Sequence, residues 1–398
     1  MENNNDNKVL NVPHLRFPEF SGEWKKCKLG DLCNVLMCKR ILVSQTNTED
    51  GVPFYKIGTI GSTPDAYISK ELFDDYKVKY NYPRKGEVMI TCAGTVGKCV
   101  VYDGEDAYFQ DSNIVWIDNP TQYISNGFLF HLLSKVDWRK LNSTTIIRIY
   151  NDDLRNLKMS YPRKEEQQKI SHLLSLLDER IATQNKIIYK LKSLIRGIMV
   201  ELQKRGLSNG TWKKVLLSNV LTERNELNKS LYPVYSVSVI QGIVNQMEYL
   251  GRSFAASDTS KYHVVHYGDL VYTKSPTGSF PYGIIKQSYN QNEVAVSPLY
   301  GVYEPKTFST GVFLHEYFKS ELNTLNYLHP LVQKGAKNTI NIANQRFLES
   351  YVAIPSNANE LLAISKLLCS LNTKLEFLQN ILKQSQGQKQ YLLRQMFI

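Results

Sequence analysis

The sequence lacks the long apolar runs and cysteine pairs that would assign it to several common classes. No window approaches the roughly 18 uninterrupted apolar residues of a membrane-spanning helix. Its six cysteines contain no C-x-x-C pair, so no zinc-ligand pattern is indicated and we expect reduced, mostly buried thiols. The first ten residues are polar and rich in Asn, which is typical of a frayed tail rather than a signal peptide. We therefore expect a cytoplasmic protein with no membrane partner.

Motifs of catalysis are missing as well. Residues 94–99 end like a phosphate loop but lack the G-x-x-x-x-G-K-[ST] spacing, and His263-Val264-Val265-His266 lacks the H-E-x-x-H spacing of a zinc site. No Ser or Cys nucleophile has a His partner by motif. The Asn-Pro-Pro-aromatic tetrapeptide of amino-methyltransferases and a G-x-G-x-x-G cofactor loop are also absent. We therefore expect this chain to be non-catalytic, with no metal and no cofactor of its own.

The composition is that of a globular protein with an excess of positive charge. At 398 residues the chain is too long for one typical domain, and its 42% hydrophobic and 21% charged residues are ordinary. The net charge of +11 favours a polyanionic partner through steering and counterion release. A basic cytosolic protein without such a partner has the same composition, so charge alone leaves both interpretations open.

An internal repeat with a spacing of about 190 residues organises the chain. Three segments return in the same order: Trp24-Lys25-Lys26 with Leu29 as Trp212-Lys213-Lys214 with Leu216 and Leu217, Gly86–Thr91 as Gly268–Thr273, and Ile149-x-Asn151 as Ile342-x-Asn344. Each match is weak alone, but together they are hard to attribute to chance. The unit is a half-molecule, which predicts one fold used twice with a pseudo-twofold relationship.

The strongest part of the repeat is helical. Residues 165–205 contain no Pro and one Gly, and their apolar positions alternate at intervals of four and three, as in a heptad seam. We predict the following seam, whose second copy lies 194 residues after the first: Ile170, Leu174, Leu177, Ile181, Ile188 and Leu191, then Ile364, Leu368, Leu371, Leu375, Leu378 and Leu382. Gln184 fills one slot of the first copy, and Ser385 and Lys389 interrupt the second.

Two such helices favour a pair that spaces two domains. A helix of about 40 residues would be roughly 60 Å long, which is longer than the diameter of a domain of about 140 residues. The far end of the helix therefore needs another partner. Each seam could instead dock only on its own domain. We predict mutual, antiparallel packing as a coiled coil.

The segments between the helices are mixed and rich in strands, so the fold class is α+β. Short strands are predicted at 88–90, 99–102, 114–117, 264–265, 270–272 and 351–354, and helices at 128–141 and 313–327. The expected organisation is a tail (1–22), a first domain (23–160), a central spacer helix (161–206), a second domain (207–354) and a C-terminal spacer helix (355–398). Trp24 and Trp212 are predicted to pack in the core at the start of each domain.

Together these features resemble the specificity subunit of type I restriction–modification enzymes. The resemblance covers nearly the whole chain, from Pro18–Trp24 to Met396-Phe397, and is most specific at Tyr161–Ile170 followed by Leu176–Glu179. The second copy departs from that junction: Glu360-Leu361-Leu362 replaces Glu-Gln-Gln, and Asn372-Thr373 replaces Asp-Glu. The departure leaves the helix intact and weakens the inference that both junctions dock partners equally.

The resemblance implies two target-recognition domains, each reading one half of an asymmetric, bipartite sequence in double-stranded DNA. It also implies that the helices set the gap between the half-sites and dock two modification (methyltransferase) subunits, with restriction (motor–nuclease) subunits joining through the complex. S-adenosylmethionine, ATP and Mg are then expected on partner subunits. An enzyme with two lobes, such as a nuclease or methyltransferase, and a basic coiled-coil adaptor are the alternative functions.

The candidate DNA-binding residues lie mainly in loops after the repeated Gly-acidic strand. Arg, Lys, Asn and Gln discriminate bases, whereas phosphates need only cations, hydroxyls and amides, and small residues let a backbone approach DNA closely. The candidates in these loops are Thr91, Gly94, Thr95 and Lys98 in the first half, and Thr273, Lys274, Ser275 and Thr277 in the second. A plain β-turn is the alternative for each of them.

Further candidates follow each tryptophan or precede the junction helices: Lys39, Arg40, Arg224, Asn225, Arg148, Tyr150, Lys334, Lys337 and Asn341. For the Lys39-Arg40 and Arg224-Asn225 pairs, exposed salt bridging is the alternative interpretation.

Overall fold

The structure is a computed structural model that describes residues 10–140, 148–252, 254–334 and 340–398. The chain divides into two compact units: Met1–Gln184 with Ile381–Ile398, and Asn185–Asn380. The long helices α4 (Lys164–Ser208) and α9 (Ala358–Gln395) each contribute one part to both units. The α+β class predicted from the sequence is confirmed.

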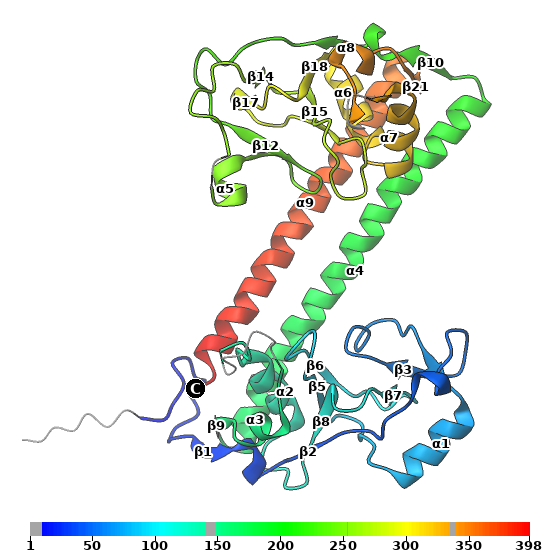
Figure 1. The fold of residues 1–398 in the computed structure, drawn as a ribbon. Coiled ribbons are helices and arrows are strands. Elements are labelled where there is room, and N and C mark those ends of the chain that lie inside the picture. The colour runs from blue at the N-terminus through cyan, green and yellow to red at the C-terminus, as the bar shows by residue number, and fades with distance from the viewer. Residues whose placement is uncertain (1–9, 141–147, 253, 335–339) are drawn as a thin grey trace, which may run out of the picture. The chain divides into compact units, whose positions relative to one another are not determined.

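Unit 1 is built around an antiparallel sheet. Its strands are β1 (Lys25–Lys28), β2 (Asn34–Leu36), β3 (Val52–Tyr55), β4 (Tyr67–Ile68), β5 (Val88–Thr91), β6 (Cys99–Val101), β7 (Tyr108–Phe109), β8 (Ile114–Asp118) and β9 (Lys158–Tyr161). Its domain helices are α1 (Lys70–Lys79), α2 (Asn126–Lys135) and α3 (Asn151–Arg155). The central sheet has the order β2-β8-β5-β6, β1 pairs with β9, and a smaller sheet has the order β4-β3-β7. Figure 1 shows α2 beside β5 and β6.

Unit 2 repeats this frame. Its strands are β10 (Trp212–Leu216), β11 (Leu221–Glu223), β12 (Tyr235–Ser238), β13 (Gly242–Asn245), β14 (His263–Val265), β15 (Leu270–Tyr272), β16 (Ile285–Gln287), β17 (Val294–Val296), β18 (Gly301–Pro305), β19 (Gln333–Lys334), β20 (Ile340–Asn341) and β21 (Tyr351–Pro355). Its domain helices are α5 (Gln246–Leu250), α6 (Phe308–Tyr317), α7 (Glu321–Leu328) and α8 (Asn344–Phe347). The sheet order β11-β18-β15-β16 and the pair β10-β21 match those of unit 1. The predicted repeat is therefore present in the topology.

The insertions between the repeated strands differ. Between β2 and β5, unit 1 has β3, β4 and helix α1, whereas unit 2 has the β12-β13 hairpin, the short α5 and β14 between β11 and β15. The shared frame thus carries unlike surfaces, as the low sequence similarity outside the repeat predicts.

The predicted strands are confirmed. The first predicted domain helix is shorter than predicted, and the second is two separate helices. Helix α2 ends at Lys135 because Val136 adopts an extended backbone, which lets Trp138 enter the core. The second predicted helix is broken into α6 and α7, because the Ser320 hydroxyl accepts the Asn323 N–H at 3.3 Å and starts a new helix there.

Both units bury one part of each long helix. In unit 2, Ile195 and Met199 of α4 share a core with Ile364 and Leu368 of α9 and with the domain. In unit 1, residues from the beginning of α4 share a core with residues from the end of α9, such as Leu174 and Leu393. The beginning of one helix therefore meets the end of the other in unit 1, and the converse holds in unit 2, so the helices are antiparallel.

The predicted seam positions are buried or half-buried, while the residues between them are mostly exposed. The interruptions of the second seam have structural counterparts. Ser385 is buried, and Lys389 forms an ion pair with Asp178 of α4 within unit 1. A cation on the seam thus contributes a directed contact between the two helices.

Candidate nucleic-acid interface

The junction between each domain and its long helix is built from buried polar groups. In unit 1, Glu166 accepts hydrogen bonds from Arg16 Nε at 2.8 Å and from the indole Nε1 of Trp24 at 3.3 Å. The amide of Gln167 donates to the carbonyls of Tyr123 and Pro162 at 2.9 and 3.0 Å. Because Glu166 and Gln167 are fully buried, they hold the unit together and offer no surface for a partner.

Trp24 and Trp212 are each 3% exposed, which confirms their predicted place in the core. In unit 2, Trp212 donates to Glu360 at 2.8 Å, so this part of the junction is repeated. The Gln167 network has no counterpart, because Leu361 stands at the equivalent position.

Two predicted segments of unit 1 come together beyond the end of β5. The N–H of Ile149 donates to the carbonyl of Cys92 at 2.9 Å, which brings Arg148 and Tyr150 to the 91–98 loop. The Tyr150 side chain is 61% exposed, and the Arg148 guanidinium lies 5.8 Å from its ring centroid. The hydroxyl of Thr95 donates to the carbonyl of Ile57 at 3.0 Å. This edge of the sheet thus gathers Gly94, Thr95, Arg148 and Tyr150.

Other members of the same loop make contacts inside the protein. Thr91 is fully buried, and its hydroxyl accepts the N–H of Lys98 at 3.0 Å. The Lys98 ammonium donates to the carbonyl of Ile60. A Cβ at Gly97 would lie 2.2 Å from Cδ1 of Trp138. The glycine at 97 therefore permits internal packing, a different role from the close approach to DNA predicted for the small residues of this loop.

The corresponding loop of unit 2 exposes a different set of side chains. Thr273 is buried and its hydroxyl accepts the N–H of Ile284 at 3.1 Å, so it too is structural. Lys274 has a left-handed backbone with φ of 59°, which is uncommon for a side chain of this size, and burial lowers the pKa of its ammonium. Ser275 is exposed, and its carbonyl accepts the hydroxyl of Thr277 at 3.0 Å. Lys274, Ser275 and Thr277 remain candidates.

The guanidinium of Arg224 forms ion pairs with carboxylates within unit 2. Its Nε and Nη2 donate to Asp269 at 2.8 and 3.2 Å, and Nη2 also lies 3.2 Å from Glu304. Its Nη1 lies 3.8 Å from Glu226. The salt-bridging alternative therefore applies to Arg224, because the buried Asp269 needs a counter-charge. Its neighbour Asn225 is exposed.

The remaining candidates of unit 2 lie in β19, in β20 or between them. Lys334 and Asn341 belong to these strands, whose register pairs Lys334 with Ile340 and Gln333 with Asn341. Lys337 lies outside the described residues.

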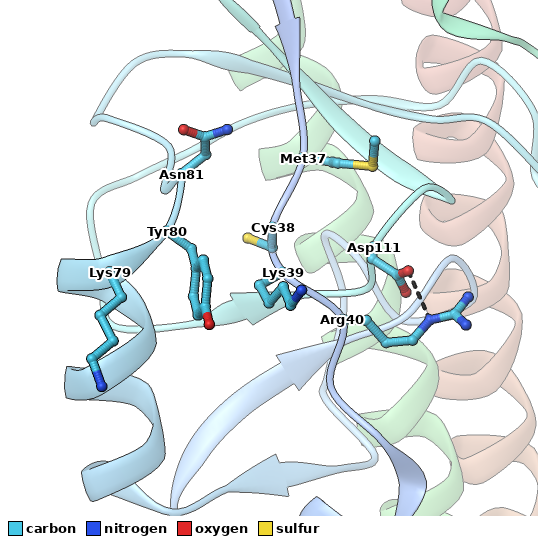
Figure 2. A pocket seen from close by; sticks show the side chains of 8 residues that line it. All are labelled: Met37, Cys38, Lys39, Arg40, Lys79, Tyr80, Asn81 and Asp111. Atoms are coloured by element: carbon cyan, nitrogen blue, oxygen red, sulfur yellow. Dashed lines mark hydrogen bonds and ion pairs between the residues drawn. The ribbon is translucent and has the colours of Figure 1, made fainter.

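Lys39 and Arg40 line an open hollow of about 630 Å³ in unit 1 (Figure 2). The other lining residues are Met37, Cys38, Lys79, Tyr80, Asn81 and Asp111. The Lys39 ammonium lies 5.5 Å from the centroid of the Tyr80 ring. Arg40 Nε donates to Asp111 Oδ2 at 2.9 Å. The lining thus carries three cations and one carboxylate, but Lys79 is paired with Asp75 and Arg40 with Asp111, which leaves Lys39 as the cation of the lining best placed for an anionic ligand.

Lys79, Tyr80 and Asn81 also line the hollow but are not among the residues predicted from the sequence. The alternation of basic and aromatic residues around positions 77–82 is a signal that could have found them. Burial raises the pKa of the Cys38 thiol to about 12, so it is neutral and unreactive. Within the described ranges, no three His, Cys, Asp or Glu residues are grouped so that they could hold a metal ion. The hollow can bind and orient a ligand through charge, hydrogen bonds and stacking.

In the part of the chain that the structure describes, no helix is both long and apolar enough to cross a membrane.

The fold is shared with a known class of protein. A crystal structure of the S subunit of a type I restriction-modification system from M. genitalium superposes with a TM-score of 0.62 at 15% sequence identity, covering 97% of this chain and 99% of that chain.

Sequence comparison agrees with the fold. Residues 21–193 match the family described as type I restriction modification DNA specificity domain. The putative type I restriction enzyme specificity subunit S.HindORF215P of Haemophilus influenzae is 47% identical over 172 residues, 43% of this chain and 42% of that protein. The putative MjaX specificity subunit of Methanocaldococcus jannaschii is 24% identical over 213 residues, 50% of each chain. The matches thus span half or less of these relatives.

Over residues 21–193, the chain is thus similar to the type I restriction modification DNA specificity domain. The resemblance predicted from the sequence is confirmed.

Proposed function

We propose that the chain is the DNA-specificity subunit of a type I restriction–modification complex. Each unit would read one half of an asymmetric, bipartite target in double-stranded DNA. The observation that carries this proposal is the repeated frame: the sheets β2-β8-β5-β6 and β11-β18-β15-β16 have one topology but unlike insertions and unlike side chains at the same edge. One scaffold with two different reading surfaces fits two different half-sites.

The long helices would set the gap between the half-sites and dock two modification subunits. Helix α4 has 45 residues and α9 has 38, which correspond to about 68 and 57 Å at 1.5 Å per residue. Apolar side chains remain exposed on both helices, including Leu194 and Val200 on α4 and Leu367 and Phe377 on α9. The modification subunits would cover these side chains.

Catalysis would belong to the partners. The chain would act without a cofactor, while S-adenosylmethionine, ATP and Mg would be held by the modification and restriction subunits. The net charge of +11 supports binding to DNA through counterion release.

Methylome sequencing tests the proposal. Cells that express the chain with its modification subunit should carry methylated adenines at one split sequence with a fixed gap, and cells that lack the chain should not. Methylation without the chain, or at a continuous sequence, would contradict the proposed role. DNA cleavage or methyl transfer by the purified chain alone would favour the enzyme alternative.

A further inference from the structure

Arg40 stands on a rigid part of the wall of the hollow in unit 1. The chain leaves β2 and buries Cys38 and Ile41 in the core, while Lys39 and Arg40 between them face outward. The Arg40 side chain is 66% exposed. Its backbone is therefore held by the core on both sides, although its guanidinium is open to solvent.

A single carboxylate orients that guanidinium. The contacts described for Arg40 use Nε alone, which donates to Asp111 Oδ2 at 2.9 Å. Figure 2 shows the two terminal nitrogens of Arg40 turned away from Asp111. Asp111 itself is 19% exposed and sits in a constrained turn, because Gln110 N–H donates to the carbonyl of Tyr55 at 2.9 Å and Ser112 has a left-handed φ of 48°. The carboxylate is thus fixed before any ligand arrives.

The geometry points to a guanine base as the ligand of Arg40, and we propose this assignment for the half-site read by unit 1. With Nε held by Asp111, the planar fork presents two parallel N–H donors, which match the O6 and N7 acceptors of guanine in the major groove. The assignment rests on the proposed function. Asp111 acts as a positioning residue, since it orients Arg40 and need not touch DNA.

The charge of the pair favours a base over a phosphate. A phosphate group also accepts two parallel hydrogen bonds from an arginine. However, the Arg40–Asp111 pair carries no net charge, and the carboxylate repels a phosphate anion held at the same fork. The neutral edge of guanine meets no such repulsion. Lys39, which lies over the Tyr80 ring, is better suited to a phosphate contact.

Arg224 in unit 2 shows the opposite arrangement. Carboxylates of Asp269, Glu304 and Glu226 face all three of its guanidinium nitrogens. No pair of terminal donors is left for a base. The arginine that follows β11 is therefore structural in unit 2, whereas the arginine that follows β2 is available in unit 1.

The experiment uses the full chain in complex with its modification subunits and a library of random DNA duplexes, from which bound sequences are selected and read. The wild type is compared with Arg40→Lys, Arg40→Ala and Asp111→Asn, and Lys39→Met serves as a matched control from the same hollow. Unfolding temperatures check that the variants fold, which the exposure of Arg40 favours.

Both Arg40 variants should lose the preference for G at one position of one half-site, by about 5- to 150-fold, the range of one bidentate base contact. The other half-site should not change. Asp111→Asn should reduce the same preference but raise affinity for unrelated DNA, because a negative charge is removed. Lys39→Met should weaken binding to all sequences alike.

Two results would overturn the assignment and leave the proposed function standing. In the first, the wild type selects a split sequence that the Arg40 variants select unchanged. In the second, Arg40→Lys keeps the preference while Arg40→Ala weakens all sequences equally, which would identify a phosphate contact. If the wild-type complex selects no sequence, both the assignment and the proposed function fail.

Discussion

The indole Nε1 of Trp212 donates a 2.8 Å hydrogen bond to Oε1 of Glu360, and Trp24 makes the same bond to Glu166 at 3.3 Å. Each Glu lies in the first turn of a long helix, where a negative charge is stabilised by the helix dipole. Each Trp is buried beside β9 or β21 and needs a hydrogen-bond acceptor. The same Trp–Glu hydrogen bond thus connects domain to helix in both units, and among the described residues only Glu166 has a second donor, Arg16.

We expect Glu166→Gln to destabilise its unit more than Glu360→Gln destabilises the other. The first change removes the counter-charge of Arg16, which lies 2.7 Å away and is itself largely buried, and breaking such a pair costs about 3 kcal/mol. The second weakens one hydrogen bond, at a cost of about 1 kcal/mol. Hydrogen exchange at β1 and β10 reports the two units separately. Equal losses of protection would show that the Arg16 contact adds nothing.

The long helices and the repeat could be predicted because local patterns determine them. The seam has a period that belongs to an α-helix whatever it packs against. The repeat is visible because a few positions, such as Trp24 and Trp212, need the same residue in both copies.

The binding surface could be predicted only in part. Lys79 and Asp111 join Lys39 and Arg40 through contacts between segments far apart in the chain, which no local pattern encodes. Arg224 is equally basic in sequence, yet the carboxylate of Asp269, 45 residues later, neutralises it. A basic residue in a sequence therefore indicates a ligand only when the fold leaves some of its donors open to solvent, as it does for the terminal nitrogens of Arg40 and not for those of Arg224.

His131 in α2 should make unit 1 sensitive to mild acid. Its ring is 1% exposed, and in the described structure neither nitrogen has a hydrogen-bond partner. Burial, aided by Lys389 of α9 and opposed by Asp178 of α4, lowers the pKa of His131 from 6.5 to about 4. The unfolded chain therefore binds the proton more readily, so stability is complete above pH 6.5 and falls as the pH decreases toward 4.

The loss attributable to His131 should approach about 3 kcal/mol, measured as the change in the free energy of urea unfolding across this pH range. In His131→Leu the slope should flatten, and stability at pH 7 should hold or rise because two unpaired nitrogens are removed. An unchanged slope in this variant would assign the acid sensitivity to other groups.

Gly97→Ala should destabilise the protein more than Gly278→Ala, although both glycines have a left-handed backbone in matching loops, with φ of 82° and 56°. Each substitution places a Cβ on a left-handed backbone, which destabilises the protein by about 1 kcal/mol. Only at Gly97 would the new Cβ meet Trp138, 2.2 Å away, which adds about 1–3 kcal/mol for overpacking. Nothing lies within 4 Å of a Cβ at Gly278. Thermal unfolding of the two variants measures the difference, and equal shifts would contradict the packing role of Gly97.

Lengthening both helices should change the gap between the half-sites and leave the half-sites themselves unchanged. Four residues inserted after Gln184 and after Asn380, where the chain divides into its two units, add about 6 Å to each helix, or not quite two base pairs at 3.4 Å per pair. Seven residues add about 10 Å, or three base pairs, and also preserve the heptad register of the seams. Methylome sequencing reports the gap and both half-sites together. An insertion in one helix alone is the control: it shifts the register of one seam against the other and should lower stability without producing a longer gap. Altered half-sites with an unchanged gap would show that the helices do not set the spacing.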